Sequence, residues 1–139
     1  MRKNTQTAFR KSLEHPTTIA TNYLNVYTID NVMSDENPSD YTYLVLNSIL
    51  CSLDEPESWQ RAQKLTRNRK EFLERLRDYP CDQMTPAQIQ RLEKYTLHPK
   101  YSPETILAES TDLALLAEWV IALVSYGRGR VQHVRQRES

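Results

Sequence analysis

Glycine is scarce in this sequence, since Gly127 and Gly129 are the only two among 139 residues. Asn-Gly and Asp-Gly pairs, the strongest short signals of β-hairpins, do not occur, which argues against a β-meander or a barrel. A glycine-rich loop of the kind that wraps a nucleotide phosphate is also missing. Leucine, glutamate, arginine and glutamine are abundant instead, and these residues favour helices. The sequence therefore predicts an all-α protein.

Residues that commonly carry catalysis or hold metals are few and dispersed. The two cysteines, Cys51 and Cys81, are too few for a disulfide framework and lack the close spacing of a zinc site, so we expect reduced thiols. The three histidines, His15, His98 and His133, lie in separate segments, and no metalloprotease or serine-hydrolase motif occurs. We expect no catalytic residue, no metal and no cofactor. The chain is interpreted as a binding module rather than an enzyme.

A net charge is also lacking, because 18 basic residues balance 18 acidic ones. A neutral chain is a poor binder of polyanions, so we do not expect a nucleic-acid partner. Two stretches are nevertheless locally basic. Residues 61–70 hold five positive charges and no acid, and residues 127–139 hold four arginines against Glu138 alone. Either stretch is suited to an acidic partner.

Long apolar runs are missing as well. The longest, Leu113–Val124, is interrupted by Glu118 and falls short of the roughly 18–20 residues of a membrane span. The N-terminus begins with positive charge but has no apolar segment typical of a secretion signal; a transit peptide is the less favoured alternative. We expect a cytoplasmic protein without a membrane partner.

The chain divides into three parts by composition. Residues 1–38 show weak periodicity and many Thr, Asn, Ser and Asp residues, so we predict an irregular N-terminal segment, in which a short helix near Thr18–Val26 is the one element the pattern allows. Residues 39–126 are predicted to form a helical domain. Residues 127–139, which begin with the two glycines, are predicted to form a basic flexible tail.

Helix signals recur through residues 39–126. Residues 39–40 can cap a helix over 39–53, and a second helix is predicted over 59–79, with a polar stretch at 66–70 where it can bend. Thr85 and Ser102, each followed by proline, open two short helices. The expected core residues are on the apolar faces of these helices and of the last one: Trp59, Leu65, Phe72, Leu76, Leu92, Tyr95, Trp119 and Val120.

The last helix is expected to begin at Ser110 or Thr111, with Asp112 in its electropositive first turn. Its apolar residues alternate at spacings of three and four, a heptad-like seam barely two heptads long: Leu113, Leu116, Val120, Leu123 and Gly127.

Several spacings follow one another in a recognisable order. The first part is Ile49-Leu50, Trp59-x-x-Ala62-x-Lys64-Leu65 and Phe72-Leu73-x-x-Leu76-x-x-Tyr79. The second part is Ile89, Leu92, Tyr95, His98-Pro99-Lys100-Tyr101-x-Pro103-Glu104, Ser110, Leu116-x-x-Trp119-Val120 and Tyr126. In this order they resemble the microtubule-binding tip of a dynein heavy-chain stalk, over residues 39–126.

The resemblance implies a small multi-helix bundle at the end of a truncated antiparallel coiled-coil stalk. It also implies binding to microtubules, whose acidic tubulin surface calls for basic contacts. The matching candidates here are Arg91, Lys94 and Lys100, and Leu97 does not extend that basic row. By the same resemblance, the ATPase lies outside this chain, other dynein or axonemal subunits are further partners, and the cytoskeleton or the cilium is the expected location.

The sequence also departs from the family pattern. The first helix is preceded by Pro38 alone and carries no basic residue, and Glu118 stands where many members have a basic residue. Two alternatives therefore stay open beside microtubule binding. One is a relative that keeps the fold without tubulin affinity and acts as a structural or protein-interaction module in a cilium or the cytoskeleton. The other is an unrelated helical adaptor or nucleic-acid binder.

Overall fold

The computed structural model describes residues 14–138, with side chains up to residue 131. This part of the chain is helical and contains no strand, so the predicted all-α class is confirmed. It consists of a short 3₁₀ turn, η2 (Cys81–Gln83), and these α-helices: α2 (Pro16–Asn22), α3 (Val26–Met33), α4 (Asp40–Ser52), α5 (Trp59–Leu65), α6 (Arg69–Arg77), α7 (Pro86–Thr96), α8 (Pro103–Glu109) and α9 (Thr111–Glu138).

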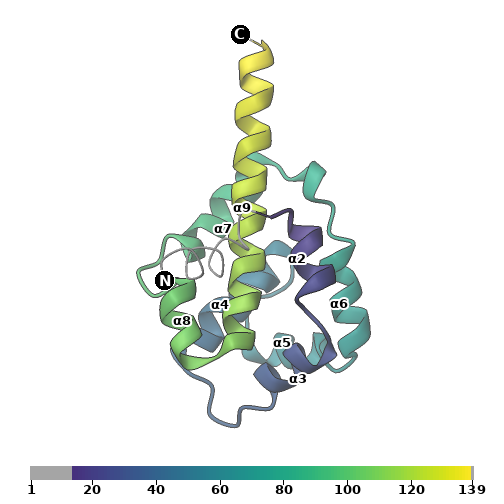
Figure 1. Ribbon diagram of the computed structural model, residues 1–139, viewed down its shortest axis with the longest axis vertical. Helices are drawn as coiled ribbons and strands as arrows, with labels where there is room; N and C mark the ends of the chain where they lie inside the picture. Colours follow the sequence, from purple (N-terminus) through teal and green to yellow (C-terminus); the bar gives the residue numbers. More distant parts are fainter. Residues whose placement is uncertain (1–13, 139) are drawn as a thin grey trace, which may run out of the picture.

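The helix α9 organises the bundle. It runs along the long axis of the molecule, with α7 and α8 on one side, α2, α3 and α6 on the other, and its C-terminal part projecting beyond the other helices (Figure 1). Its 28 residues correspond to about 42 Å of helix. The inner part is buried on all sides: Leu116, Trp119, Val120 and Leu123 are fully buried there, and Glu118 is the one charged residue buried among the described residues. A helix buried all round is the centre of a core.

The helices α4 and α7 begin where the sequence predicts. The Ser39 hydroxyl accepts a hydrogen bond from the amide of Thr42 at 3.4 Å. Thr85 and Gln88 form a reciprocal capping box, in which the Gln88 side chain accepts from the Thr85 amide at 2.8 Å and the Thr85 hydroxyl accepts from the Gln88 amide at 3.2 Å. Such caps satisfy backbone amides that a helix leaves without partners.

The long helix predicted over residues 59–79 is two helices, α5 and α6, separated by a turn. The Thr66 hydroxyl donates to the carbonyl of Ala62 at 2.7 Å. Asn68 then accepts from the amide of Glu71 at 3.0 Å and caps α6. Side chains that bond the backbone locally compete with the helical ladder. The predicted bend is therefore a full break, located within the polar stretch.

The described part of the N-terminal segment is not irregular, which corrects the prediction for residues 1–38; residues 1–13 lie outside the described part. His15 caps α2, and Asn25 and Thr28 form a capping box on α3. Ile19 and Ile29 are buried in the common core. Helices of seven and eight residues are marginal alone, so burial against α6 and α9 stabilises them.

The predicted flexible tail from residue 127 is also wrong for residues 127–138, because α9 continues to Glu138. Gly127 lies against Ile89 of α7, and a β-carbon at that position would come within 2.8 Å of its Cδ1 atom. The glycine therefore allows a close approach of two helices and does not end α9. Arg128, the residue after Gly127, donates a hydrogen bond to Glu93 of α7, which keeps this part of α9 on the bundle.

The residues expected in the core divide into two groups. Five are buried: Phe72, Leu76, Leu92, Trp119 and Val120. Three are partly buried and pack at the margin of the core: Trp59, Leu65 and Tyr95. Trp59 makes an edge-to-face contact with Tyr43, with ring centroids 5.5 Å apart, at the surface between α4 and α5.

Candidate functional site

Two of the three candidate cations, Arg91 and Lys100, lie at opposite ends of α4, and the third, Lys94, follows Arg91 by one turn on α7. Arg91, on α7, contacts Asp54, which follows the C-terminal end of α4. Lys100, in the loop between α7 and α8, contacts Asp40, the first residue of α4. The 13 residues of α4 span about 20 Å, so Arg91 and Lys100 mark the two ends of one elongated surface. We call this the α4–α7 surface.

Two of the three cations are already ion-paired within the chain. The guanidinium of Arg91 is 3.3 Å from a carboxylate oxygen of Asp54, and the ammonium of Lys100 is 3.3 Å from one of Asp40. Lys100 also lies 5.8 Å above the ring of Tyr41. All four charged side chains are about half-exposed or more. Pairs this exposed contribute roughly 0–1 kcal/mol and exchange readily with water or a partner.

Lys94 differs from the other two candidates, because it makes no ion pair with any described residue. It is exposed on α7, one turn before Leu97, which is 76% exposed. The neighbouring Tyr95 hydroxyl is hydrogen-bonded to the carboxylate of Glu57. The α4–α7 surface thus offers one uncompensated cation beside an exposed apolar side chain.

A second basic surface lies between α5 and α6, where the sequence showed its densest positive charge. A groove of about 340 Å³ runs there, and we call it the α5–α6 groove. Glu55 holds two arginines beside it, Arg61 at 2.6 Å and Arg75 at 3.1 Å. The hydrogen bond from Arg61, with that from Arg75, keeps the pKa of Glu55 below its usual value.

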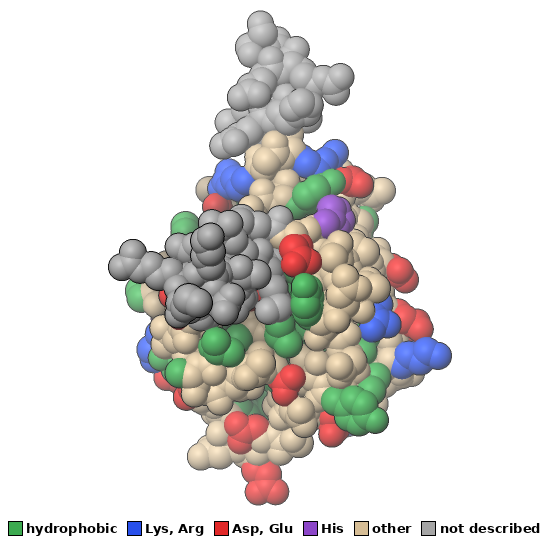
Figure 2. Space-filling model, in the orientation of Figure 1, with side chains coloured by type: hydrophobic (Ala, Val, Ile, Leu, Met, Phe, Trp, Pro, Cys, Tyr) green, Lys and Arg blue, Asp and Glu red, His purple; other side chains and the backbone are tan. Residues whose placement is uncertain are grey.

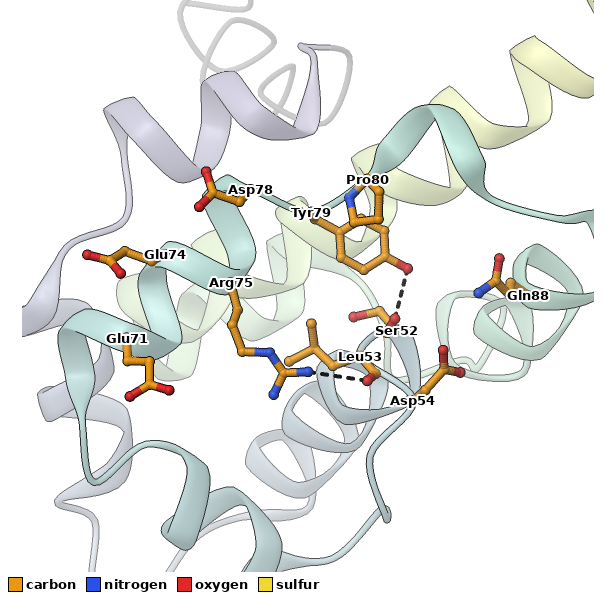
Figure 3. Close-up of a pocket in the computed structure, with 10 residues that line it drawn as sticks. All are labelled: Ser52, Leu53, Asp54, Glu71, Glu74, Arg75, Asp78, Tyr79, Pro80 and Gln88. Atoms are coloured by element: carbon orange, nitrogen blue, oxygen red, sulfur yellow. Dashed lines mark hydrogen bonds between the residues drawn. The ribbon is translucent and has the colours of Figure 1, made fainter.

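The hollow on the other side of Arg75 has the opposite charge. It has a volume of about 490 Å³ and, beside Arg75, is lined by four acidic residues: Asp54, Glu71, Glu74 and Asp78. Figure 3 shows Arg75 donating to the carbonyl of Leu53, at 3.4 Å, and the Tyr79 hydroxyl donating to that of Ser52, at 2.8 Å. Burial raises the pKa of Tyr79 to about 12. This hydroxyl therefore stays protonated and serves as a structural donor.

Charge is mixed on the face of the molecule that Figure 2 draws. Figure 2 shows acidic, basic and apolar side chains in small clusters on one face, without a continuous patch of one sign. Within residues 14–131, no group of three or more His, Cys, Asp or Glu side chains is arranged to hold a metal ion. No described helix is long and apolar enough to cross a lipid bilayer.

The two cysteines are free thiols that are partly or fully buried. Cys81 is buried and Cys51 is partly buried, and they are not joined to each other. Burial raises the pKa of both thiols. Since the thiolate is the reactive form, burial makes both thiols less reactive than a free cysteine at the same pH.

Comparison with known proteins gives two significant similarities, both to dynein heavy chains. The chain is 26% identical over 90 residues to the dynein-1-beta heavy chain of the flagellar inner arm I1 complex of Chlamydomonas reinhardtii. It is 29% identical over 91 residues to dynein axonemal heavy chain 6 of Homo sapiens.

These matches cover 65% and 66% of this chain but only 2% of each heavy chain. No protein-family model matches the chain. The chain spans a very small part of the relatives it matches, so their activity as whole proteins does not transfer to it. What the matches support is a relationship in sequence between about two thirds of this chain and axonemal dynein heavy chains.

Proposed function

We propose that this chain is a microtubule-binding module of the dynein stalk-tip type, part of or derived from a minus-end-directed motor. The observation that carries the proposal is the similarity to two axonemal heavy chains, combined with three basic side chains on the α4–α7 surface. Tubulin is the partner, together with other dynein or axonemal subunits, and the cytoskeleton or axoneme is the place of action. ATP hydrolysis belongs to a part of such a motor that this chain does not include.

The electrostatics of the α4–α7 surface set the expected affinity. Asp54 and Asp40 neutralise Arg91 and Lys100 in the unbound chain. A carboxylate of tubulin must replace them, and the gain on exchanging one exposed partner for another is small. Lys94 needs no such exchange. We therefore expect weak binding that disappears as salt shortens the Debye length from about 10 Å at 0.1 M to about 3 Å at 1 M.

The direct test is co-sedimentation of the whole chain with microtubules over a salt series. The wild type is expected to pellet at low salt and to remain in the supernatant at high salt. Arg91→Glu combined with Lys94→Glu should abolish pelleting while leaving the far-ultraviolet circular dichroism and the Tm nearly unchanged. A wild-type chain that stays soluble with microtubules at low salt would refute the proposal.

A gain-of-binding variant sharpens this test. Replacing Asp40 and Asp54 by asparagine removes the internal partners of Lys100 and Arg91 at nearly constant side-chain size. If these two cations face tubulin, the double variant should bind several-fold more tightly than the wild type at the same salt. Unchanged or weaker binding would show that the two cations lie outside the interface.

The internal pairing favours a second candidate function. A relative that has lost its tubulin contacts would keep the helical bundle and would satisfy its basic residues within the chain, as Arg91, Lys100 and Arg128 are satisfied here. Such a protein would serve as a structural or protein-interaction module in a cilium or the cytoskeleton. It would remain in the supernatant with microtubules at every salt concentration, yet would be retained by axonemal proteins in a binding assay.

A further inference from the structure

The α5–α6 groove is a second charged surface, and no residue that lines it belongs to the α4–α7 surface. It lies between the C-terminal end of α5 and the first turns of α6. Four basic side chains line it, accompanied by one acidic residue, an amide and two apolar side chains: Arg61, Lys64, Arg67, Arg75, Glu71, Asn68, Leu65 and Phe72.

The basic side chains of the groove differ in how far they are compensated. Arg61 and Arg75 share the carboxylate of Glu55. Lys64 and Arg67, in contrast, make no ion pair and no side-chain hydrogen bond with any described residue, and both are exposed. The one acid that lines the groove, Glu71, accepts a hydrogen bond from Asn68 at 3.3 Å. Two cations are thus left available at the opening of the groove.

The wall and the size of the groove restrict what fits. Leu65 is partly buried and Phe72 almost completely so, and they supply an apolar wall below the charges. A volume of about 340 Å³ is at the lower end for binding pockets. It accommodates a few side chains of an extended segment but not a folded surface or a duplex.

The groove adjoins the acidic hollow, so the predominant charge changes from positive to negative between the two cavities. Glu71 and Arg75 line both cavities, so they form the ridge between them. Three further carboxylates stand on the far side of that ridge: Asp54, Glu74 and Asp78. A continuous run of negative charge, such as a nucleic-acid backbone, would be repelled as it crossed the ridge. A short acidic segment confined to the groove would not.

We propose that the α5–α6 groove binds a short, extended, glutamate-rich segment of a partner protein, whose carboxylates pair with Lys64 and Arg67 while its aliphatic stems contact Leu65 and Phe72. Long charged side chains bury such stems along apolar surface. This interaction does not depend on the proposed binding of tubulin through the α4–α7 surface, because the two surfaces use different residues.

The test uses a fluorescently labelled octaglutamate peptide and the whole chain, with fluorescence anisotropy measured at low salt and at about 0.3 M salt. Saturable binding at low salt, weakened at least several-fold at the higher concentration, is expected. Lys64→Glu combined with Arg67→Glu should weaken binding at least tenfold. The matched control is Arg91→Glu with Lys94→Glu, which exchanges the same two residue types at the other surface and should change the affinity less than twofold.

Three results would overturn the proposal: no binding by the wild type at low salt, equal weakening by both double variants, or tighter binding of a single-stranded oligonucleotide of the same charge. Should the glutamate variant unfold, Lys64→Gln with Arg67→Gln removes the same charges more gently. Backbone amide shifts caused by the peptide should then map to residues 64–72 in the wild type and vanish in this variant. Because the microtubule assay depends on Arg91 and Lys94, failure of one proposal is distinguishable from failure of the other.

Discussion

Arg77, at the C-terminal end of α6, joins this helix to α2 by two hydrogen bonds. Its Nε atom lies 3.3 Å from the carbonyl oxygen of Ala20, and an Nη atom lies 3.2 Å from that of Leu24. These carbonyls belong to the last turn of α2 and the residues just beyond it, where a helix offers no amides to its own carbonyls. We therefore expect Arg77 to hold α2 in place.

The magnitude follows from the kind of bond. A hydrogen bond with a charged donor contributes roughly 1.5–3 kcal/mol. Both distances are slightly long and the Arg77 side chain is half-buried, so each of the two bonds is assigned about 1–1.5 kcal/mol, at or just below the lower end of this range. Arg77→Ala should lower the free energy of unfolding by about 2–3 kcal/mol, or the Tm by about 6–10 °C. Arg77→Lys keeps the charge but lacks the forked geometry, so its loss should be smaller.

Urea unfolding followed by circular dichroism measures the global effect, and amide hydrogen exchange over residues 16–33 measures the local one. Arg67→Ala is the control, since Arg67 is exposed and its side chain bonds no described residue. Protection of the α2 amides should fall in Arg77→Ala and not in the control. If the two variants differ by less than about 0.5 kcal/mol, the reasoning from these hydrogen bonds is wrong.

Other predictions concern single positions. Thr85→Ala removes half of a capping box and should lower the free energy of unfolding by about 1 kcal/mol, measured by urea unfolding. Gly129→Ala should raise the free energy of unfolding by about 0.5–1 kcal/mol, because the new β-carbon meets no atom within 4 Å. Gly127→Val should lower it by about 1–3 kcal/mol, because the new side chain presses on Ile89. Thermal melts of the two variants test these opposite signs. The raised pKa of Tyr79, about 12 in the folded chain against about 10 unfolded, means that the unfolded state loses its proton first as pH rises. The contribution of this raised pKa to the free energy of unfolding is fully present below pH 10 and is lost as pH rises to 12. The loss is at most about 2 kcal/mol, because Tyr79 is partly exposed. In Tyr79→Phe the free energy of unfolding should therefore fall less steeply between pH 10 and 12 than in the wild type.

The helices that the sequence predicts well are those whose ends are determined locally. Ser39 and Thr85 bond amides three residues away, and Pro86 stands at the first position of α7. Signals of this kind involve residues within one helical turn, so they can be recognised in the sequence without knowledge of the rest of the fold. The break between α5 and α6 was indicated by polar residues, although its extent depends on how Thr66 and Asn68 bond the backbone.

The sequence allows a short helix near Thr18–Val26, which overlaps α2, but it does not predict α3 or the burial of either helix, because distant parts of the chain stabilise them. Arg77 is more than 50 positions from the two carbonyls that it bonds at the end of α2 and just beyond it. Asn31 of α3 donates to Asp112, 81 positions away, at 3.0 Å. Such contacts leave no periodic trace in a short segment. The continuation of α9 past Gly127 is a comparable case, since a glycine normally weakens a helix and here fits against Ile89.

The sequence was enough to select the candidate cations, but it could not show which of them form ion pairs with acids of the same chain. Asp54 and Arg91 are 37 positions apart, and Asp40 and Lys100 are 60 apart. Only the folded chain shows that these acids meet these bases. The same holds for the α5–α6 groove, where the sequence showed a cluster of positive charge but not that Lys64 and Arg67 remain unpaired while Arg61 is held by Glu55.

The placement of α2 also bears on how a stalk-tip relative would work. A coiled coil that transmits a change by a shift of register needs a helix that is able to slide along α9. Residues 16–33 are not arranged in that way: α2 packs on both α6 and α9, Arg77 fixes its end, and the His15 ring meets Tyr126 of α9 edge-on at 4.6 Å. Sliding of this segment would break the buried contacts of Ile19 together with the Arg77 hydrogen bonds. In this conformation, therefore, α2 and α3 stabilise the bundle against α9 and are not free to slide along it.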